Sequence, residues 1–149
     1  MKQLFRVILL PLIAIPLIAF SATKDEAKAL AEKAAALINA EGVEAARAKL
    51  HDPKGEFIDG ELYIFVIDFT GNTLVHGGKP SQVGENLIKI KDPDGVFFLR
   101  EMIDVVKKYG SGWVKYLWTN PETNKVTQKI TYVLRLKESD ALVGCGVYE

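Results

Sequence analysis

The residues best suited to chemistry lie between Trp113 and Leu136, a segment that reads as two strands around a turn. It places Lys129 among tryptophan and tyrosine side chains. A buried ammonium group needs an anionic partner or loses its proton. Aromatic rings with one polar atom are a common lining for small polar ligands, so the carboxylate of a ligand is one candidate partner. The alternative interpretation is that Lys129 is a solvated side chain on an exposed face of a sheet.

The alternation of side chains along a strand sorts these residues by face. Tyr116 and Trp118 share one face of the first strand, whereas Lys129 and Tyr132 occupy opposite faces of the second. Which faces lie on the same side of the sheet depends on the pairing register, and a bulge can shift that register.

Residue types for catalysis or metal binding are sparse. His51 and His76 are the only histidines, and the sequence has no HExxH motif, clustered Cys/His set or GxSxG elbow. The single cysteine, Cys145, lies between two glycines and is interpreted as a small thiol packed where neighbouring backbones approach. The run 91–95 lacks the later carboxylate of a calcium loop, and we interpret its Asp94 as a helix cap. We therefore expect no enzyme activity, no cofactor and no metal site.

The chain of 149 residues suits one domain and has balanced charge, with 19 basic and 19 acidic side chains. Lys2 and Arg6 precede an apolar run from 7 to 20, and small residues follow, which is the pattern of a secretory signal peptide. We expect residues 1–21 to be cleaved, with a retained N-terminal anchor as the alternative, and residues 22–149 to form the mature domain. No basic cluster favours nucleic acid, and an exported domain without disulfides suits a bacterial periplasm.

Patterns along the rest of the chain predict an α+β domain. A Ser/Thr-x-x-Glu capping box at Thr23 and Glu26 starts a long helix, which continues to about Leu50 with an interruption at Gly42. A second helix is expected over 97–109, after a loop over 77–95. Runs with strand character occur at 61–69, 73–76, 113–118, 125–137 and 141–148. Short turns between them favour a five-stranded antiparallel sheet.

A series of short motifs then resembles a known family. They are FVIDFTGNTLVH at 65–76, VGENL at 83–87, DPDG at 92–95, FLRE at 98–101, GWVKYLW at 112–118, KITYV at 129–133 and GCGVY at 144–148. In this order they resemble the single Cache domain of bacterial extracytoplasmic sensors, over nearly the whole mature chain. The resemblance implies a PAS-like sheet, with the long N-terminal helix on one face and a small-ligand pocket on the other.

The resemblance also implies which residues form the pocket. Family motif positions fall on His76, Tyr116, Trp118, Lys129 and Tyr132. Arg100 is a further candidate cation, in the FLRE motif. For each of these the alternative is a plain core or surface role.

From these observations we expect a periplasmic module that binds or senses a short-chain organic acid. The chain stops at Glu149 without a signalling domain, so we expect no output of its own and a membrane sensor or receptor as partner. The alternative is a structural or interaction protein that dimerises or docks through its N-terminal helix, whose narrow Ala/Leu stripe would serve as a seam.

Overall fold

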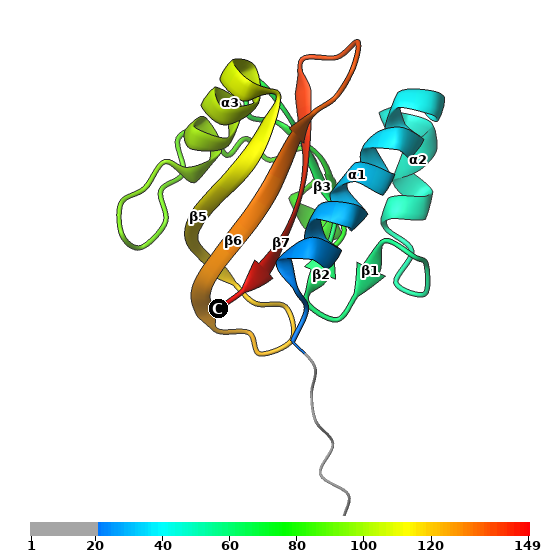
Figure 1. The fold of residues 1–149 in the computed structure, drawn as a ribbon. Coiled ribbons are helices and arrows are strands. Elements are labelled where there is room, and N and C mark those ends of the chain that lie inside the picture. Colours follow the sequence, from blue (N-terminus) through cyan, green and yellow to red (C-terminus); the bar gives the residue numbers. More distant parts are fainter. Residues whose placement is uncertain (1–20) are drawn as a thin grey trace, which may run out of the picture.

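Figure 1 shows the computed structural model, which describes residues 21–149. The predicted signal peptide lies outside the described residues, apart from Ser21 at its end. Helices α1 and α2 cover one face of a sheet, and helix α3 lies with the connecting loops on the other face (Figure 1). Among residues 21–149, no helix is both long and apolar enough to cross a bilayer.

Helix α1 (Lys24–Glu41) begins at the predicted capping box. The Glu26 N–H donates to Thr23 Oγ1 over 3.2 Å, and the Thr23 N–H donates to Glu26 Oε2 over 2.7 Å. The helix ends where Gly42 adopts a φ of 85°, a backbone conformation that favours glycine. Helix α2 (Val43–Leu50) follows directly, so the predicted interruption at Gly42 is confirmed.

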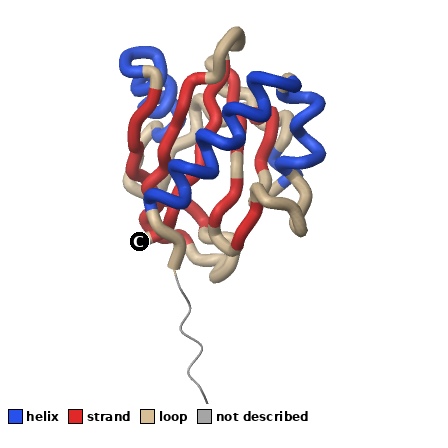
Figure 2. Tube along the Cα trace, turned by 45° about the vertical axis from the view of Figure 1, so that its right-hand side comes forward, coloured by secondary structure: helices blue, strands red, loops and turns tan. Residues whose placement is uncertain are grey.

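The apolar side of α1 packs on the sheet, which the helix crosses in Figure 2. Ala27, Ala31 and Ala34 are fully buried there. Small side chains allow the helix backbone to approach the strands closely, which accounts for the alanine-rich stripe. These alanines are fully buried within one chain, whereas Leu30 and Leu37 of the same stripe are only partly buried.

The main sheet has five antiparallel strands in the order β4-β3-β7-β6-β5, which confirms the predicted fold class. They are β3 (Phe65–Asp68), β4 (Thr73–His76), β5 (Ser111–Thr119), β6 (Val126–Arg135) and β7 (Ala141–Tyr148). The strand predicted over 61–69 is divided, because β2 (Leu62–Tyr63) pairs with β1 (Ile58–Asp59) in a separate two-stranded sheet. The chain then enters the main sheet at Phe65, between β4 and β7.

Helix α3 (Phe98–Tyr109) forms as predicted but is capped differently. Phe97 occupies the cap position and provides no side-chain cap, so the assignment of Asp94 as helix cap is wrong. The neighbouring Asp92 instead closes the turn, since its carboxylate accepts from the Val96 N–H at 2.8 Å and from the Leu117 N–H at 2.9 Å. This second bond ties the loop before α3 to the edge strand β5.

The sheet therefore separates two cores. On the α1 face the core includes Leu50, Val66, Tyr132, Val143 and Cys145, and on the α3 face it includes Phe65, Leu99, Met102, Tyr116 and Leu142. The two glycines around Cys145 permit this packing. A side chain at Gly144 would collide with the ring of Phe65, and one at Gly146 would collide with Thr131.

Candidate ligand-binding site

Lys129 is fully buried in the sheet, with 0% of its surface exposed. Its Nζ donates to Tyr63 Oη over 2.7 Å and lies 4.0 Å from the centre of that ring. It also lies 4.8 Å from the ring centre of Tyr148. Among residues 21–149, no carboxylate lies within ion-pairing distance of this ammonium group. The interpretation of Lys129 as a solvated surface residue is therefore wrong.

Burial controls the charge of Lys129. Removal from water lowers its pKa to about 7, and the influence of Cys145 and Glu61 opposes this only in part. The two rings below the ammonium supply the favourable interaction of a cation with an aromatic face. Lys129 thus gains or loses its proton near neutral pH.

Two tyrosines link Lys129 to the end of β5 in a hydrogen-bonded chain. Tyr148 Oη donates to the Thr119 carbonyl over 2.8 Å, and the Tyr63 and Tyr148 hydroxyls are 3.2 Å apart. A phenol has one hydrogen, so Tyr148 has none left to give to Tyr63. Tyr63 must therefore donate to Tyr148 and accept from Lys129. Burial raises the pKa of both phenols, that of Tyr148 to about 12, so neither provides a negative charge for the lysine.

His76 is a neutral donor in the same region. Its Nδ1 accepts the Lys79 backbone N–H at 2.9 Å, which places the ring proton on Nε2. Burial lowers the pKa of His76 to about 3, and the charge of Lys129 contributes in the same direction. The ring stacks on Tyr63 at a centroid distance of 5.0 Å.

A hollow of about 450 Å³ opens beside these groups. Its wall consists of Tyr63, His76, Gly78, Lys79, Gln82, Trp118, Thr119, Pro121 and Asn124. None of these is acidic, and Lys79 adds an exposed cation at the rim. A crevice of about 20 Å³ shares Tyr63, His76 and Trp118 with this hollow and reaches the rings of Phe98 and Tyr116. The arrangement suits a small anion with an apolar portion.

The structure brings four of the six residues expected at the pocket to this region. His76 and Trp118 line the hollow, Tyr116 lines the crevice, and Lys129 lies behind Tyr63. The Tyr116 hydroxyl is 3.2 Å from Thr131 Oγ1, so its polar end is satisfied within the sheet.

Arg100 and Tyr132 are not part of this site. Arg100 is exposed on α3, where its Nε donates to the Ile88 carbonyl over 2.9 Å and its guanidinium stacks on Phe97. Tyr132 lies on the opposite face of the sheet, 5.2 Å from the ring of Trp113, because strand alternation turns it away from Lys129. The second cation near the hollow is instead Lys79.

Other parts of the site lie outside the six residues expected at the pocket. Tyr63 belongs to the short strand β2, and Lys79 and Gln82 border the 3-10 helix η1 (Pro80–Gln82) within the predicted loop. The signal for Tyr63 is a polar ring within the mostly apolar run 61–69. Nothing in the loop sequence marks Gln82 as a buried residue.

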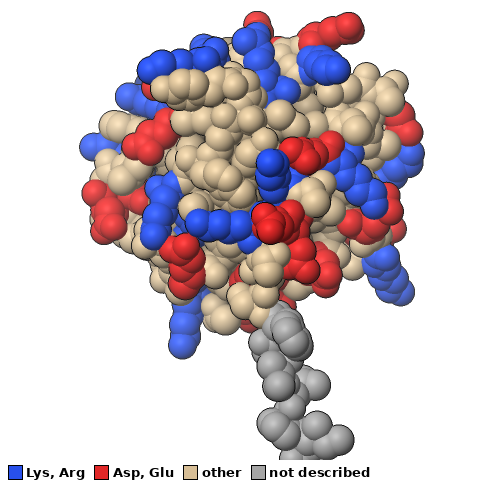
Figure 3. Space-filling view, in the orientation of Figure 1, with Lys and Arg blue, Asp and Glu red and all other residues tan. Residues whose placement is uncertain are grey.

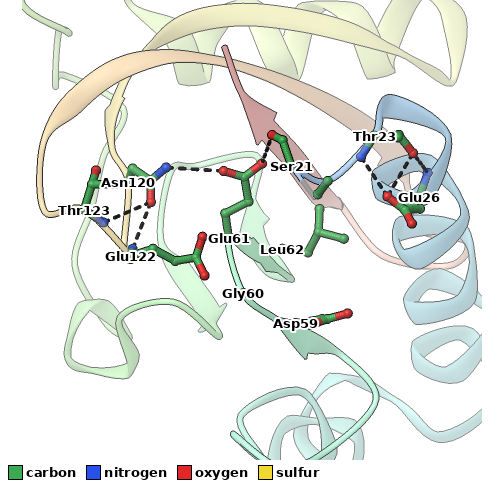
Figure 4. Close-up of a pocket in the computed structure, with 11 residues that line it drawn as sticks. Ser21, Thr23, Glu26, Asp59, Gly60, Glu61, Leu62, Asn120, Glu122 and Thr123 are labelled. Atoms are coloured by element: carbon green, nitrogen blue, oxygen red, sulfur yellow. Dashed lines mark hydrogen bonds between the residues drawn. The ribbon is translucent and has the colours of Figure 1, made fainter. Parts of the chain in front are cut away.

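A second hollow, of about 590 Å³, lies between the start of α1 and the turn after β1. Figure 4 shows that two of the carboxylates around it are used within the fold: Glu26 turns back into the capping box, and Glu61 binds Asn120 and Ser21, whereas no hydrogen bond is drawn to the carboxylates of Asp59 and Glu122. Among residues 21–149, no three metal-ligating side chains are grouped to hold an ion. The site around Lys129 is therefore the stronger candidate.

A long N-terminal helix on one face of a five-stranded antiparallel sheet, with buried polar groups beside a hollow on the other, defines a class of α+β ligand-sensing domains. The family described as "Single Cache domain 2" matches residues 21–149, and the chain belongs to it. Domains of this family are extracytoplasmic sensor domains without catalytic activity of their own.

Proteins similar in sequence are membrane signalling proteins. The chain is 36% identical over 86 residues to the sensor histidine kinase MctS of Rhizobium johnstonii, and 28% identical over 90 residues to the chemotaxis protein McpP of Pseudomonas putida. These regions cover 58% and 60% of this chain, but only 18% and 16% of the relatives. The chain thus corresponds to less than a fifth of either relative.

Solved structures agree over most of the chain. A methyl-accepting chemotaxis protein from Vibrio parahaemolyticus superposes with a TM-score of 0.73 and 28% identity, covering 84% of this chain and 87% of that one. A Cache chemosensory domain described for its recognition of carboxylic acids gives a TM-score of 0.68 and 28% identity, covering 83% and 91%.

Proposed function

We propose that this domain binds a short-chain carboxylic acid outside the cytoplasm, in the hollow beside Tyr63 and His76, with Lys129 supplying the positive charge. The observation that carries this proposal is the fully buried ammonium of Lys129, which has two phenol rings but no carboxylate partner among residues 21–149. Burial of an isolated charge is costly, and an anionic guest offsets that cost.

The hydrogen-bonded chain offers a route by which Lys129 acts on a guest that it does not touch. Tyr63 lines the hollow and accepts from Lys129. Rotation of one phenol hydrogen, from Tyr148 to a carboxylate in the hollow, makes Tyr63 a donor to the guest. The ammonium behind it strengthens that bond, because charge-assisted hydrogen bonds are roughly twice as strong as neutral ones.

His76 and Trp118 complete the proposed contacts. His76 bears its proton on Nε2 and stays neutral above about pH 3, so it offers a second donor without adding charge. Trp118 provides an apolar wall for the carbon chain. The structure of a Cache domain named for carboxylic acid recognition, at 28% identity, supports the choice of ligand class.

The family and the N-terminal pattern of the sequence support a place of action outside the cytoplasm. We propose export to the periplasm by a signal peptide over 1–21, with the bound form read by a membrane receptor or kinase. The relatives are such membrane proteins, which supports this choice of partner.

A thermal-shift panel tests the binding proposal. Acetate, propionate, pyruvate and lactate are titrated against the full chain, and at a hundred times its dissociation constant a ligand raises the stability by about 2.7 kcal/mol. Lys129→Met, which keeps the apolar stem and removes the charge, is expected to abolish the shift. Lys115→Ala is the matched control, since Lys115 on β5 is half-exposed and pairs with Glu149. A panel in which no acid shifts the melt, or in which Lys129→Met responds like the parent, contradicts the proposal.

A further inference from the structure

Gln82 is a buried polar residue in the wall of the hollow. It lies at the end of η1, is 8% exposed and lines the same hollow as Tyr63 and His76. Its side-chain Oε1 is buried and accepts no hydrogen bond from residues 21–149. The backbone of the residue is used differently, since its N–H donates to the Lys79 carbonyl and its carbonyl accepts from Glu85.

An unsatisfied buried carbonyl has a cost that natural proteins seldom leave uncompensated. Nine-tenths or more of buried polar groups have a partner, and leaving one without costs about 1–3 kcal/mol. The fold gains nothing visible from an amide at this position, because a methionine or leucine would fill similar space without that cost. An amide here is explained if a polar group reaches it from the hollow.

The chemistry of an amide limits which kind of polar group can pair with it. The terminal torsion of glutamine is broad, so rotation presents either the oxygen or the NH₂ group to a guest. A hydroxyl group both donates and accepts, and it therefore satisfies the amide in either orientation. An alkyl chain satisfies neither and would leave the amide desolvated and unpaired.

We infer that Gln82 is a specificity-determining residue of this hollow, which selects short hydroxy acids over alkyl acids of the same length. The inference rests on the proposed function, since the carboxylate is held by Tyr63, His76 and the charge of Lys129. Gln82 then contacts the second polar group of the guest. Sites built to bond a hydroxyl reject analogues without it, because their own polar groups lose a partner.

Isothermal titration of the full chain with three acids of equal carbon number tests the inference. Lactate or 3-hydroxypropionate is expected to bind about tenfold or more tightly than propionate, in line with one hydrogen bond gained and one unpaired amide avoided. Gln82→Met is expected to remove this preference by weakening the hydroxy acid, while propionate binds at least as well as to the parent.

The control is Gln128→Met. Gln128 precedes Lys129 on β6, so alternation turns its side chain to the opposite face, and it lines neither this hollow nor the crevice. This variant is expected to keep the parental preference.

The outcomes separate the two proposals. If the parent binds propionate as tightly as both hydroxy acids, or if Gln82→Met keeps the preference, the role of Gln82 is overturned while carboxylate binding stands. If the variant fails to fold, an absence of preference in the parent still overturns the role of Gln82. If none of the three acids binds, the proposed function fails and the role of Gln82 fails with it.

Discussion

The two faces of the sheet bury very different side chains, although the same strands supply both. On the α1 face, β6 contributes Tyr132, which packs among aliphatic residues and the alanines of α1. On the α3 face, the same strand contributes Lys129 and Thr131, both fully buried. Hydrophobic burial alone explains the first face. The second face includes polar groups, and burying such groups lowers the stability of the fold unless they are paired.

This difference indicates where stability and function reside. Natural proteins stay just above the stability that they need, and they concentrate unfavourable burial at functional sites. Both faces bury a hydrophobic core, but the α3 face also buries Lys129 and His76, the residues of the proposed ligand site. The charged residues seen over the surface in Figure 3 are interspersed by sign, so that view shows no competing site of one charge.

The largest expected effect concerns the charge of Lys129. Its folded pKa of about 7 lies below its ordinary 10.5, so the folded state resists the charged form. The free-energy cost of burying the charged Lys129 is fully present below pH 7, and it disappears as the pH rises to about 10.5. Lys129→Met should therefore be more stable than the parent at pH 6, and the difference in unfolding free energy should shrink by on the order of 5 kcal/mol by pH 10.5.

Chemical denaturation across this pH range measures that difference. Lys115→Met, at a half-exposed lysine, provides the comparison and should show little pH-dependent change. A constant difference between Lys129→Met and the parent from pH 6 to 10 would mean that folding does not lower the pKa of Lys129.

Substitutions on the α1 face should change the stability of the fold but not the affinity for acids. Tyr132→Ala is expected to lower the unfolding free energy by about 3 kcal/mol, because it removes a large buried ring. Acid binding to the folded variant should stay within about twofold of the parent. Tyr132→Phe, which keeps the ring, should be nearly neutral, and a loss of acid affinity in Tyr132→Ala would show that the two faces are coupled.

His76 should make the protein sensitive to acid. Its folded pKa of about 3 lies below the ordinary 6.5, so the unfolded chain takes up a proton first as the pH falls. The stability that His76 contributes is complete above pH 6.5 and is lost toward pH 3, with about 2 kcal/mol gone by pH 5. Urea titrations at pH 7 and 5 should show this loss in the parent and a smaller one in His76→Gln.

A further expected effect is on ligand affinity. A bound carboxylate favours the charged form of Lys129, whose pKa is about 7 in the free protein. The affinity for a short acid should be nearly constant from pH 6 to 7. Above pH 7 the affinity should decrease, and the decrease should approach tenfold, or about 1.4 kcal/mol, for each pH unit. Calorimetry from pH 6 to 9 measures this, and a flat profile would place the carboxylate out of reach of the ammonium.

Much of the fold was predictable because its signals are local. The capping box of α1, the break at Gly42 and the strands β5 to β7 depend on residues close together in the chain, and each was confirmed. The cap of α3 was mispredicted: Asp94 does not cap the helix, and Asp92 closes the turn and bonds to Leu117 on a strand 25 residues away. No local pattern encodes that partner.

The site was predictable only in part, for a related reason. Strand alternation already separated Lys129 from Tyr132, but motif resemblance grouped them because both lie in the same short run. Arg100 was chosen for its charge, and it satisfies that charge at the surface of α3. Lys79 and Gln82 come from a loop, where sequence gives little information about burial.

The sequence by itself determined most of the secondary structure, the antiparallel sheet and the presence of a lysine among aromatic rings. Propensity, capping and alternation act over a few residues and need no tertiary partner. The tertiary structure decided that Lys129 is fully buried and that Tyr63, Tyr148 and Thr119 complete its hydrogen-bonded chain. It also set the charge of that lysine, because the pKa of an amine depends on the water and the charges around it rather than on its neighbours in the chain.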